Sequence, residues 1–193
     1  MSNKPDDFLT LTFATPAVWE AWLAKNHATS TGLWLKIAKK ASGVASVTYD
    51  EALAVALCYG WIDGLKRTYD ATYFIQRFTP RRARSIWSKR NIGKITELTA
   101  AGRMQPAGQA EVERAQADGR WAAAYDSPAN MEVPADFVAA VERSPVAAAT
   151  FAKLSRSNLY AIAWRLTTVK TAVGRQRRFD ALLAMLERGE TIH

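Results

Sequence analysis

The sequence changes its pattern at Pro80, and this change constrains the fold more than any other feature. Before Pro80, helix-like and strand-like stretches alternate, whereas no strand pattern follows it. Over residues 33–38 apolar side chains alternate with their neighbours, which predicts a strand with one buried face. Residues 61–69 and 72–79 are rich in β-branched and aromatic types, which predicts an antiparallel hairpin. A small sheet is therefore expected in the N-terminal part alone.

Helix signals surround these strands and fill the rest of the chain. Thr15 precedes Pro16 at the start of one apolar repeat, and Thr48 with Glu51 forms a capping-box pattern that begins a second helix before Gly60. Further helices are predicted from Ser85 or Ser88 to Ala101 and over residues 107–118, 135–142, 145–154, 157–169 and 172–188. The predicted fold class is α+β, with a small antiparallel sheet and helices in the N-terminal part and a helical C-terminal part.

The stretch 125–134 carries two prolines and no clear period, so it is the best linker candidate. It separates an α+β region over 1–126 from a helical region over 131–193, and the two are expected to pack as one unit. No internal repeat is present.

Composition excludes several classes of protein. Of the 193 residues 49% are hydrophobic, so the chain can bury a core and is not disordered. One cysteine allows no internal disulfide, and two separated histidines supply no His/Cys zinc site; neither a metal nor a cofactor is predicted. The first residues lack the apolar core of a signal peptide, and no apolar run reaches roughly 18 residues. A cytoplasmic protein without a membrane span is expected.

The net charge of +8 is concentrated in two windows. Residues 71–96 contain seven basic residues and no acid, and residues 143–179 contain eight basic residues and no acid. Such segregation concentrates anions at a surface, provided that each window forms one face. The alternative is that the windows merely lack acids and are spread over several faces.

The segment 78–91 is the densest polar cluster and the predicted anion-binding site. A helix beginning near Ser85 would place free backbone N–H groups among arginines, which suits a phosphate or carboxylate. The alternative is that Trp87 packs in the core and the arginines pair with acids from elsewhere. The candidate residues are Lys66, Arg67, Arg81, Arg82, Arg84, Ser85, Trp87, Ser88, Lys89, Arg90 and Asn91.

Evidence for catalysis in the sequence is weak. Asp63 is the one acid between Glu51 and Asp70 and a weak candidate for acid/base work, but an Asp-Gly pair more often forms a turn. Cys58 lies on an apolar helical stripe, which predicts a buried and inert thiol. No phosphate loop, HExxH, GxSxG or paired CxxC motif is present.

The motifs CYGWIDGLKR (58–67), TPRRARSIWSKRN (79–91) and GRQRRFDALLAMLERGE (174–190) are similar to those of the YdeI/OmpD-associated family, whose domain is labelled bacteriocin-protection. The resemblance covers about residues 13–192. It implies an OmdA-type C-terminal domain and a part in resistance to antibacterial peptides, and it supplies no catalytic residues. Tyr59 stands where the family usually has Phe, and Gln116 where it has Lys.

Three hypotheses follow. The leading one is a cytoplasmic bacterial anion-binding module with nucleic acid as a candidate partner. The second is a small enzyme that acts on an anionic metabolite, with Asp63 as acid/base and Arg81, Arg82 or Arg84 as the clamp. The third is an interaction protein that docks through its C-terminal helices, in which Arg175, Arg177 or Arg178 contacts an acid that precedes Met131.

Overall fold

A computed structural model describes residues 8–126 and 130–193, so residues 1–7 and the centre of the predicted linker, 127–129, lie outside the described residues. The chain divides into two compact units. The first comprises the described residues up to Trp87 together with Asn91–Ala123. The second comprises Ser88–Arg90 and the described residues from Ala124 onward. That the N-terminal and C-terminal regions pack as one unit stays a prediction.

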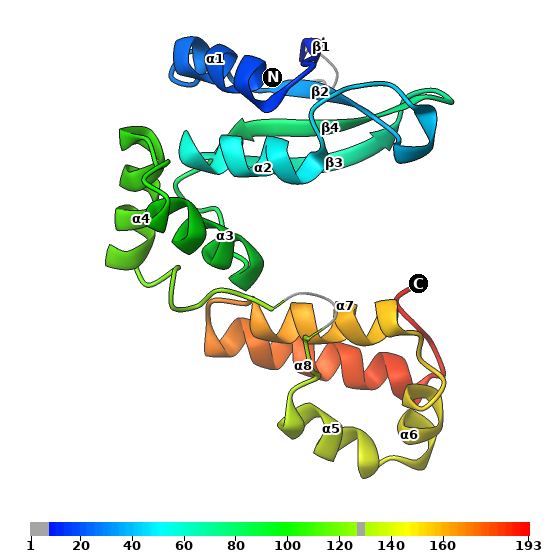
Figure 1. Cartoon of the computed structure of the whole chain (residues 1–193). Coiled ribbons are helices and arrows are strands. Elements are labelled where there is room, and N and C mark those ends of the chain that lie inside the picture. Colours follow the sequence, from blue (N-terminus) through cyan, green and yellow to red (C-terminus); the bar gives the residue numbers. More distant parts are fainter. Residues whose placement is uncertain (1–7, 127–129) are drawn as a thin grey trace, which may run out of the picture. The chain divides into compact units, whose positions relative to one another are not determined.

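The first unit is built on a four-stranded sheet in the order β1-β2-β4-β3 (Figure 1). The strands are β1 (Thr10–Thr12), β2 (Leu33–Ala38), β3 (Trp61–Thr68) and β4 (Tyr73–Pro80). β2 and β3 each pair antiparallel with β4, whereas β1 pairs parallel with β2. The α+β class is confirmed, and the hairpin lies within one residue of its predicted bounds. The sheet is mixed rather than purely antiparallel, because β1 runs parallel to β2. The sequence does not predict β1, because three residues are too few to show an alternating pattern.

Two capped helices, α1 (Pro16–Asn26) and α2 (Tyr49–Cys58), belong to the same unit. The Thr48 hydroxyl accepts a hydrogen bond from the Glu51 amide at 3.3 Å, and the Glu51 carboxylate accepts one from the Thr48 amide at 2.8 Å. This reciprocal pair is the predicted capping box, and it satisfies two backbone donors that the helix start would otherwise leave unpaired. A 3-10 turn, η1 (Lys40–Ser42), lies between β2 and α2.

The core of the first unit lies between α1 and one face of the sheet. Leu33, Leu35 and Ile37 of β2 are at most 2% exposed, which confirms the predicted buried face. The ring of Trp19 on α1 is fully buried, with its centroid 5.8 Å from that of Phe78 on β4. The indole N–H of the same tryptophan donates to a backbone carbonyl of α2 at 3.1 Å, so one aromatic side chain joins the sheet and both helices.

Two further helices, α3 (Lys89–Ala100) and α4 (Pro106–Ala117), follow the sheet. α3 begins directly after Ser88, so a helix start at Ser85 is wrong. α4 packs against the end of α2 at Gly108, where an added Cβ would lie 2.2 Å from the backbone carbonyl oxygen of Cys58. No side chain larger than hydrogen fits this approach.

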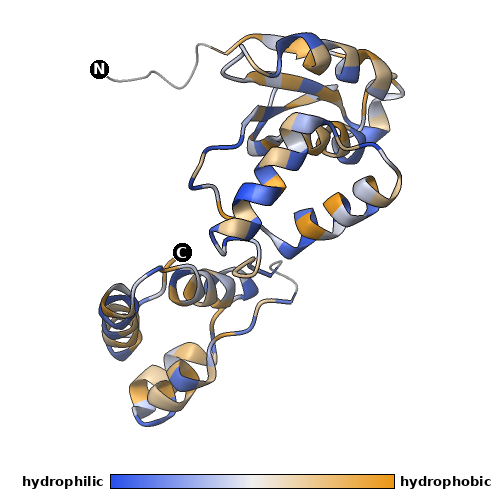
Figure 2. Ribbon diagram, turned by 90° about the vertical axis from the view of Figure 1, so that its left-hand side faces the viewer, coloured by the Kyte–Doolittle hydropathy of each residue, from blue (hydrophilic) through white to orange (hydrophobic). Residues whose placement is uncertain are grey.

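The second unit is helical, with α5 (Ala135–Glu142), α6 (Pro145–Phe151), α7 (Arg156–Thr167) and α8 (Ala172–Glu187). Figure 2 shows hydrophobic and hydrophilic residues on different sides of these helices, as an amphipathic pattern requires. The buried cluster that joins the four helices comprises Phe137, Val141, Ala147, Ile162, Leu166, Leu182 and Leu186.

α6 ends at Phe151, three residues before its predicted end. The reason is local, because the Ser155 hydroxyl accepts from the Asn158 amide at 3.3 Å and begins α7 instead. No helix in the described part of the chain is long and apolar enough to cross a membrane.

The partners that the structure shows for the arginines at the start of α8 lie within the second unit. Arg175 Nη2 lies 2.7 Å from the Asp136 carboxylate of α5, and Arg178 donates to the backbone carbonyl of Arg165 at 2.9 Å. Asp136 follows Met131, so this ion pair is not the contact with an acid before Met131, and that contact stays a prediction. The ion pair lies within the second unit and joins the first and last of its helices.

Candidate functional site

The predicted anion-binding segment begins with an arginine that packs inward. Arg81 is 7% exposed, and its guanidinium carbon lies 3.5 Å from the ring centroid of Trp87. Its backbone amide donates to the Gly60 carbonyl at 2.9 Å, and its Nη1 lies 3.4 Å from the Ile86 carbonyl oxygen. Trp87 is 1% exposed, so it packs in the core, as the alternative interpretation of this segment predicted. Its ring is therefore not available for base stacking.

The loop between β4 and α3 is braced from a second direction. The Trp87 ring centroid lies 5.0 Å from that of Trp121. The adjacent Arg120 donates to the Ser85 carbonyl at 2.9 Å while its Nε bonds the Asp118 carboxylate at 2.7 Å. Within the loop the Ser85 amide donates to the Arg82 carbonyl at 2.8 Å, closing a turn. The backbone of the loop is therefore held at both ends, which fixes the positions from which its exposed side chains project.

Burial divides the eleven candidate residues into three groups. Arg81, Trp87 and Asn91 are buried, and Ser85 and Ser88 are half-buried. Lys89 forms an ion pair with Asp126 within the second unit. Lys89 is exposed, together with Lys66, Arg67, Arg82, Arg84 and Arg90.

The exposed members of the first unit do not form one cluster. Lys66 pairs with Gln76, whereas Pro80, which precedes the loop arginines, pairs with Trp61. Five residues of strand separate Lys66 from Trp61, about 16 Å at the rise of a β-strand. Arg82 and Arg84 therefore lie at one end of the hairpin, and Lys66 and Arg67 lie toward the other.

The strand register brings together a second group of cations that sequence reasoning missed. Trp34 pairs with Arg77, and Lys36 pairs with Ile75, which in turn pairs with Arg67. Directly paired residues share a face, so Lys36, Arg67 and Arg77 lie on the face opposite the helix-covered core. We call this surface the basic sheet face and define it by Trp34, Lys36, Arg67, Tyr69, Tyr73 and Arg77.

Aromatic rings contact two of the three cations of the basic sheet face. The Lys36 ammonium lies 4.4 Å from the ring centroid of Tyr69 and 4.2 Å from that of Tyr73. The guanidinium carbon of Arg67 lies 5.0 Å from the ring centroid of Trp34, which is 3% exposed beneath it. Cation-π contacts of this kind fix a charge without neutralising it.

A β-bulge in β3 makes room for the third cation. The register shifts between Asp63 and Lys66, and the buried Gln76 donates to the Gly64 carbonyl at 2.8 Å on the core side. On the other side Arg77 lies against Gly64, where an added Cβ would be 3.2 Å from the arginine Nε. The glycine therefore allows the Arg77 side chain to lie flat across the sheet.

The basic sheet face contains no acid among the described strand residues. The remaining positions that the register places on this face are threonine, isoleucine and alanine. The neighbouring acid, Asp70, lies in the hairpin turn, where its carboxylate accepts from the backbone amides of Thr72 and Tyr73 at 2.8 and 2.7 Å. Three cations beside a 51% exposed tyrosine, Tyr69, can hold phosphates and stack a planar group.

Asp63 occupies a strand rather than a turn. Its partner in the register is Phe78, which places its side chain on the core side of the sheet, opposite Arg67 and Arg77. Its carboxylate accepts a hydrogen bond from the Tyr49 hydroxyl of α2 at 2.8 Å. The turn interpretation is wrong, because the Asp-Gly pair lies at the β-bulge. This arrangement gives Asp63 a structural contact between β3 and α2.

Cys58 is fully buried at the end of α2, and burial raises the pKa of its thiol. A raised thiol pKa favours the protonated form at neutral pH, and the thiolate is the reactive species. We expect Cys58 in the folded protein to react with a thiol reagent at pH 8 roughly two orders of magnitude more slowly than in the unfolded chain. Absorbance with Ellman's reagent, with and without denaturant, measures both rates. Equal rates would contradict the buried assignment.

Among the described residues no group of three or more His, Cys, Asp or Glu side chains could hold a metal ion.

Two family models match the chain. Residues 11–111, which contain β2, β3, β4, most of β1 and the braced loop, match a domain of unknown function (DUF8412). Residues 130–189, which contain all four helices of the second unit, match a model described as Bacteriocin-protection, YdeI or OmpD-Associated (OmdA). The chain belongs to the DUF8412 family and carries a YdeI/OmpD-associated domain. The resemblance noted in the sequence is thereby confirmed for the second unit. No curated protein and no solved structure matches the chain.

The two matches follow the structural division of the chain. The basic sheet face lies entirely within the DUF8412 region, and the OmdA region coincides with the helical unit. Of the predicted anion-binding residues, Arg67 alone belongs to the basic sheet face. Lys36 and Arg77 were missed because they lie on different strands. The register of the predicted hairpin could have placed Arg77 on the face of Arg67, whereas Lys36 joins them only through the register of β2 with β4.

Proposed function

We propose that this protein is an anion-binding module whose partner is single-stranded nucleic acid, held on the basic sheet face of the DUF8412 region. The main support for this proposal is the pairing register of β2, β3 and β4. It places Lys36, Arg67 and Arg77 on one face whose described strand positions contain no acid. A sheet that presents cations and aromatic rings binds single strands because phosphates contact the cations while bases stack on the rings. Tyr69 is the ring exposed enough to take a base.

The loop arginines add to this proposal. Arg82 and Arg84 are exposed on the braced loop, and no ion pair joins either one to a described residue. Because the backbone of the loop is already held in place, phosphate contacts by these arginines do not require the loop to be ordered. Lys66 contributes less, because it lies on the core side of the sheet with its ammonium 4.3 Å from the Phe74 ring centroid.

The family description adds a part in bacteriocin protection. In this proposal, bacteriocin protection is an indirect consequence of nucleic-acid binding. Most antibacterial peptides are cationic, and like charges disfavour their direct capture by a protein with a net charge of +8.

Fluorescence anisotropy with a short labelled oligouridine, at about 50 mM salt, tests the proposal. We expect binding, and a weaker interaction with a duplex of equal length because paired bases cannot stack on Tyr69. Tyr69→Ala should weaken single-strand binding by roughly tenfold, since stacking contributes about 1–3 kcal/mol per base, whereas Tyr69→Phe should retain it. No binding at low salt overturns the proposal. Equal loss in both variants removes Tyr69 as the stacking ring.

A further inference from the structure

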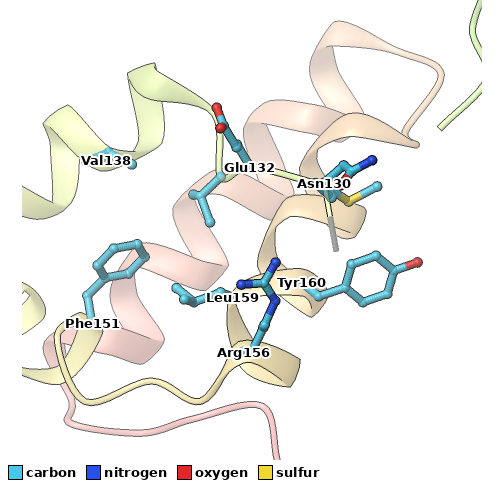
Figure 3. Close-up of a pocket in the computed structure, with 9 residues that line it drawn as sticks. Asn130, Glu132, Val138, Phe151, Arg156, Leu159 and Tyr160 are labelled. Carbon is cyan, nitrogen blue, oxygen red and sulfur yellow. The ribbon is translucent and has the colours of Figure 1, made fainter. Parts of the chain in front are cut away.

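The two ends of α7 differ in what surrounds their cations. At its start, Figure 3 shows the Arg156 guanidinium beside Leu159 in the lining of a pocket of about 620 Å³, and this arginine already has an interaction partner. At its other end α7 leads into α8 through a short turn. The exposed cations there are Arg165, Lys170, Arg177 and Arg178. No ion pair joins any of them to a described acid of the second unit, so their charge is not neutralised within that unit.

Local contacts bring these four cations together. Arg178 donates to the backbone carbonyl of Arg165 at 2.9 Å, so the second turn of α8 lies against the last turn of α7. Lys170 directly precedes Thr171, whose hydroxyl accepts a hydrogen bond from the Gly174 amide at 3.1 Å and begins α8. The fourth cation is the neighbour of Arg178 in the sequence. All four therefore lie where one helix ends and the next begins.

An exposed apolar side chain lies among these cations. Val173, in the first turn of α8, is 82% exposed. It shares a face of the helix with Arg177, because residues four positions apart are neighbours on a helix surface. The core residues Leu182 and Leu186 lie on the opposite face, so this valine takes no part in the core. We call this surface the basic helix tip and define it by Arg165, Lys170, Val173, Arg177 and Arg178.

The charge of the basic helix tip suits an anionic partner. No acid occurs from residue 143 to 179. The next acid along α8 is Asp180, which accepts a hydrogen bond from the Gln176 side chain at 2.8 Å. Four cations against this one acid leave an excess of three positive charges.

The exposed valine favours a lipid surface over a nucleic acid as that partner. Cations near an anionic membrane gain from its negative surface potential, and an aliphatic side chain that enters the headgroup region leaves water. Stacking of a base requires an exposed aromatic ring. At the basic helix tip the exposed apolar group is aliphatic instead.

We propose that the basic helix tip binds an anionic lipid surface, with Val173 entering the headgroup region and the four cations against the lipid phosphates. The proposal concerns the second unit alone and does not depend on nucleic-acid binding by the first.

Cosedimentation of the full-length protein with lipid vesicles tests the proposal. One set of vesicles contains phosphatidylcholine alone, and the other contains equal parts of phosphatidylcholine and phosphatidylglycerol. We expect binding to the mixed vesicles, and binding at least about tenfold weaker to phosphatidylcholine alone, because the anionic headgroups supply the attraction. Arg67→Gln, which removes a charge from the basic sheet face, should leave vesicle affinity within about twofold.

Paired substitutions separate the basic helix tip from net charge. Lys170→Gln combined with Arg177→Gln should weaken binding to the mixed vesicles about tenfold or more. Arg143→Gln combined with Lys153→Gln removes the same charge from exposed positions that follow α5 and α6, and should have a much smaller effect.

Substitutions of Val173 test the apolar contact. Val173→Ser should weaken vesicle binding several-fold, whereas Val173→Leu should strengthen it, because a larger apolar side chain leaves water. Both variants should keep their affinity for oligouridine.

The proposal is overturned if the mixed vesicles do not bind, if the two double variants behave alike, or if both substitutions of Val173 leave vesicle affinity unchanged. It is also overturned if Arg67→Gln costs as much vesicle affinity as the tip variant, since the basic sheet face would then hold the membrane. A loss of oligouridine binding in the Lys170 and Arg177 double variant, equal to its loss of vesicle binding, would assign the basic helix tip to nucleic acid instead.

Discussion

Gly108→Ala is expected to lower the free energy of unfolding of the first unit by about 3 kcal/mol or more. Its added Cβ would lie 2.2 Å from the carbonyl oxygen of Cys58 and 2.7 Å from the carbonyl carbon. Both neighbours are backbone atoms at the end of α2, so no side chain can rotate away. The clash is relieved only if α4 moves off α2, which opens the contact between two core elements.

Gly93→Ala provides the matched control. Gly93 is an exposed position within α3, and an added Cβ there meets nothing within 4 Å. Alanine has the higher helix propensity, so this change should raise the free energy of unfolding by about 0.5–1 kcal/mol. Urea denaturation followed by circular dichroism measures both variants. Equal shifts of the same sign would contradict the packing of α4 on α2.

Removing the charge of Arg67 is expected to weaken oligouridine binding about tenfold, whereas removing that of Lys66 should change it less than twofold. The two residues are adjacent in β3 and lose the same charge in Arg67→Gln and Lys66→Gln. They differ in the face they occupy, since Arg67 pairs with Ile75 and Lys66 with the buried Gln76. The comparison therefore isolates position on the sheet from net charge.

A second substitution on the same face should deepen the loss. Lys36→Gln combined with Arg67→Gln is expected to weaken binding about 100-fold, because two phosphate contacts are lost. Lys25→Gln combined with Lys66→Gln removes the same charge elsewhere, and Lys25 is an exposed residue near the end of α1. Anisotropy measures affinity, and circular dichroism verifies that each variant is folded. Similar losses in the two double variants would show that net charge alone drives binding.

The elements that could be predicted from the sequence are those whose causes are local. The capping box at Thr48, the hairpin and the helices of the second unit each depend on a few neighbouring residues. β1 was missed because its evidence is its pairing with β2, about two dozen residues later in the chain. The alternation over residues 33–38 predicts one buried face that does not include Trp34, yet Trp34 is 3% exposed and Arg67 from another strand lies over its ring.

The candidate site was predicted from one continuous segment, and this explains what was missed. Sequence proximity grouped Arg81 and Trp87 with Arg82 and Arg84, but stacking draws the first two into the core. Lys36 and Arg77 lie 41 positions apart in the sequence, and they share a face through the register of β2 with β4. A face made of several strands becomes visible only when that register is known.

The salt dependence of oligouridine affinity tests the central claim most directly. Each phosphate contact releases counterions, so the logarithm of the binding constant falls linearly with the logarithm of salt concentration, with a slope of about −0.7 per contact for a single strand. Three contacts from Lys36, Arg67 and Arg77 predict a slope of about −2. Contacts from Arg82 and Arg84 would make the slope more negative. Arg67→Gln should make the slope shallower by about 0.7, while Lys66→Gln leaves it unchanged. A slope near zero, or equal slopes in both variants, would contradict binding on the basic sheet face.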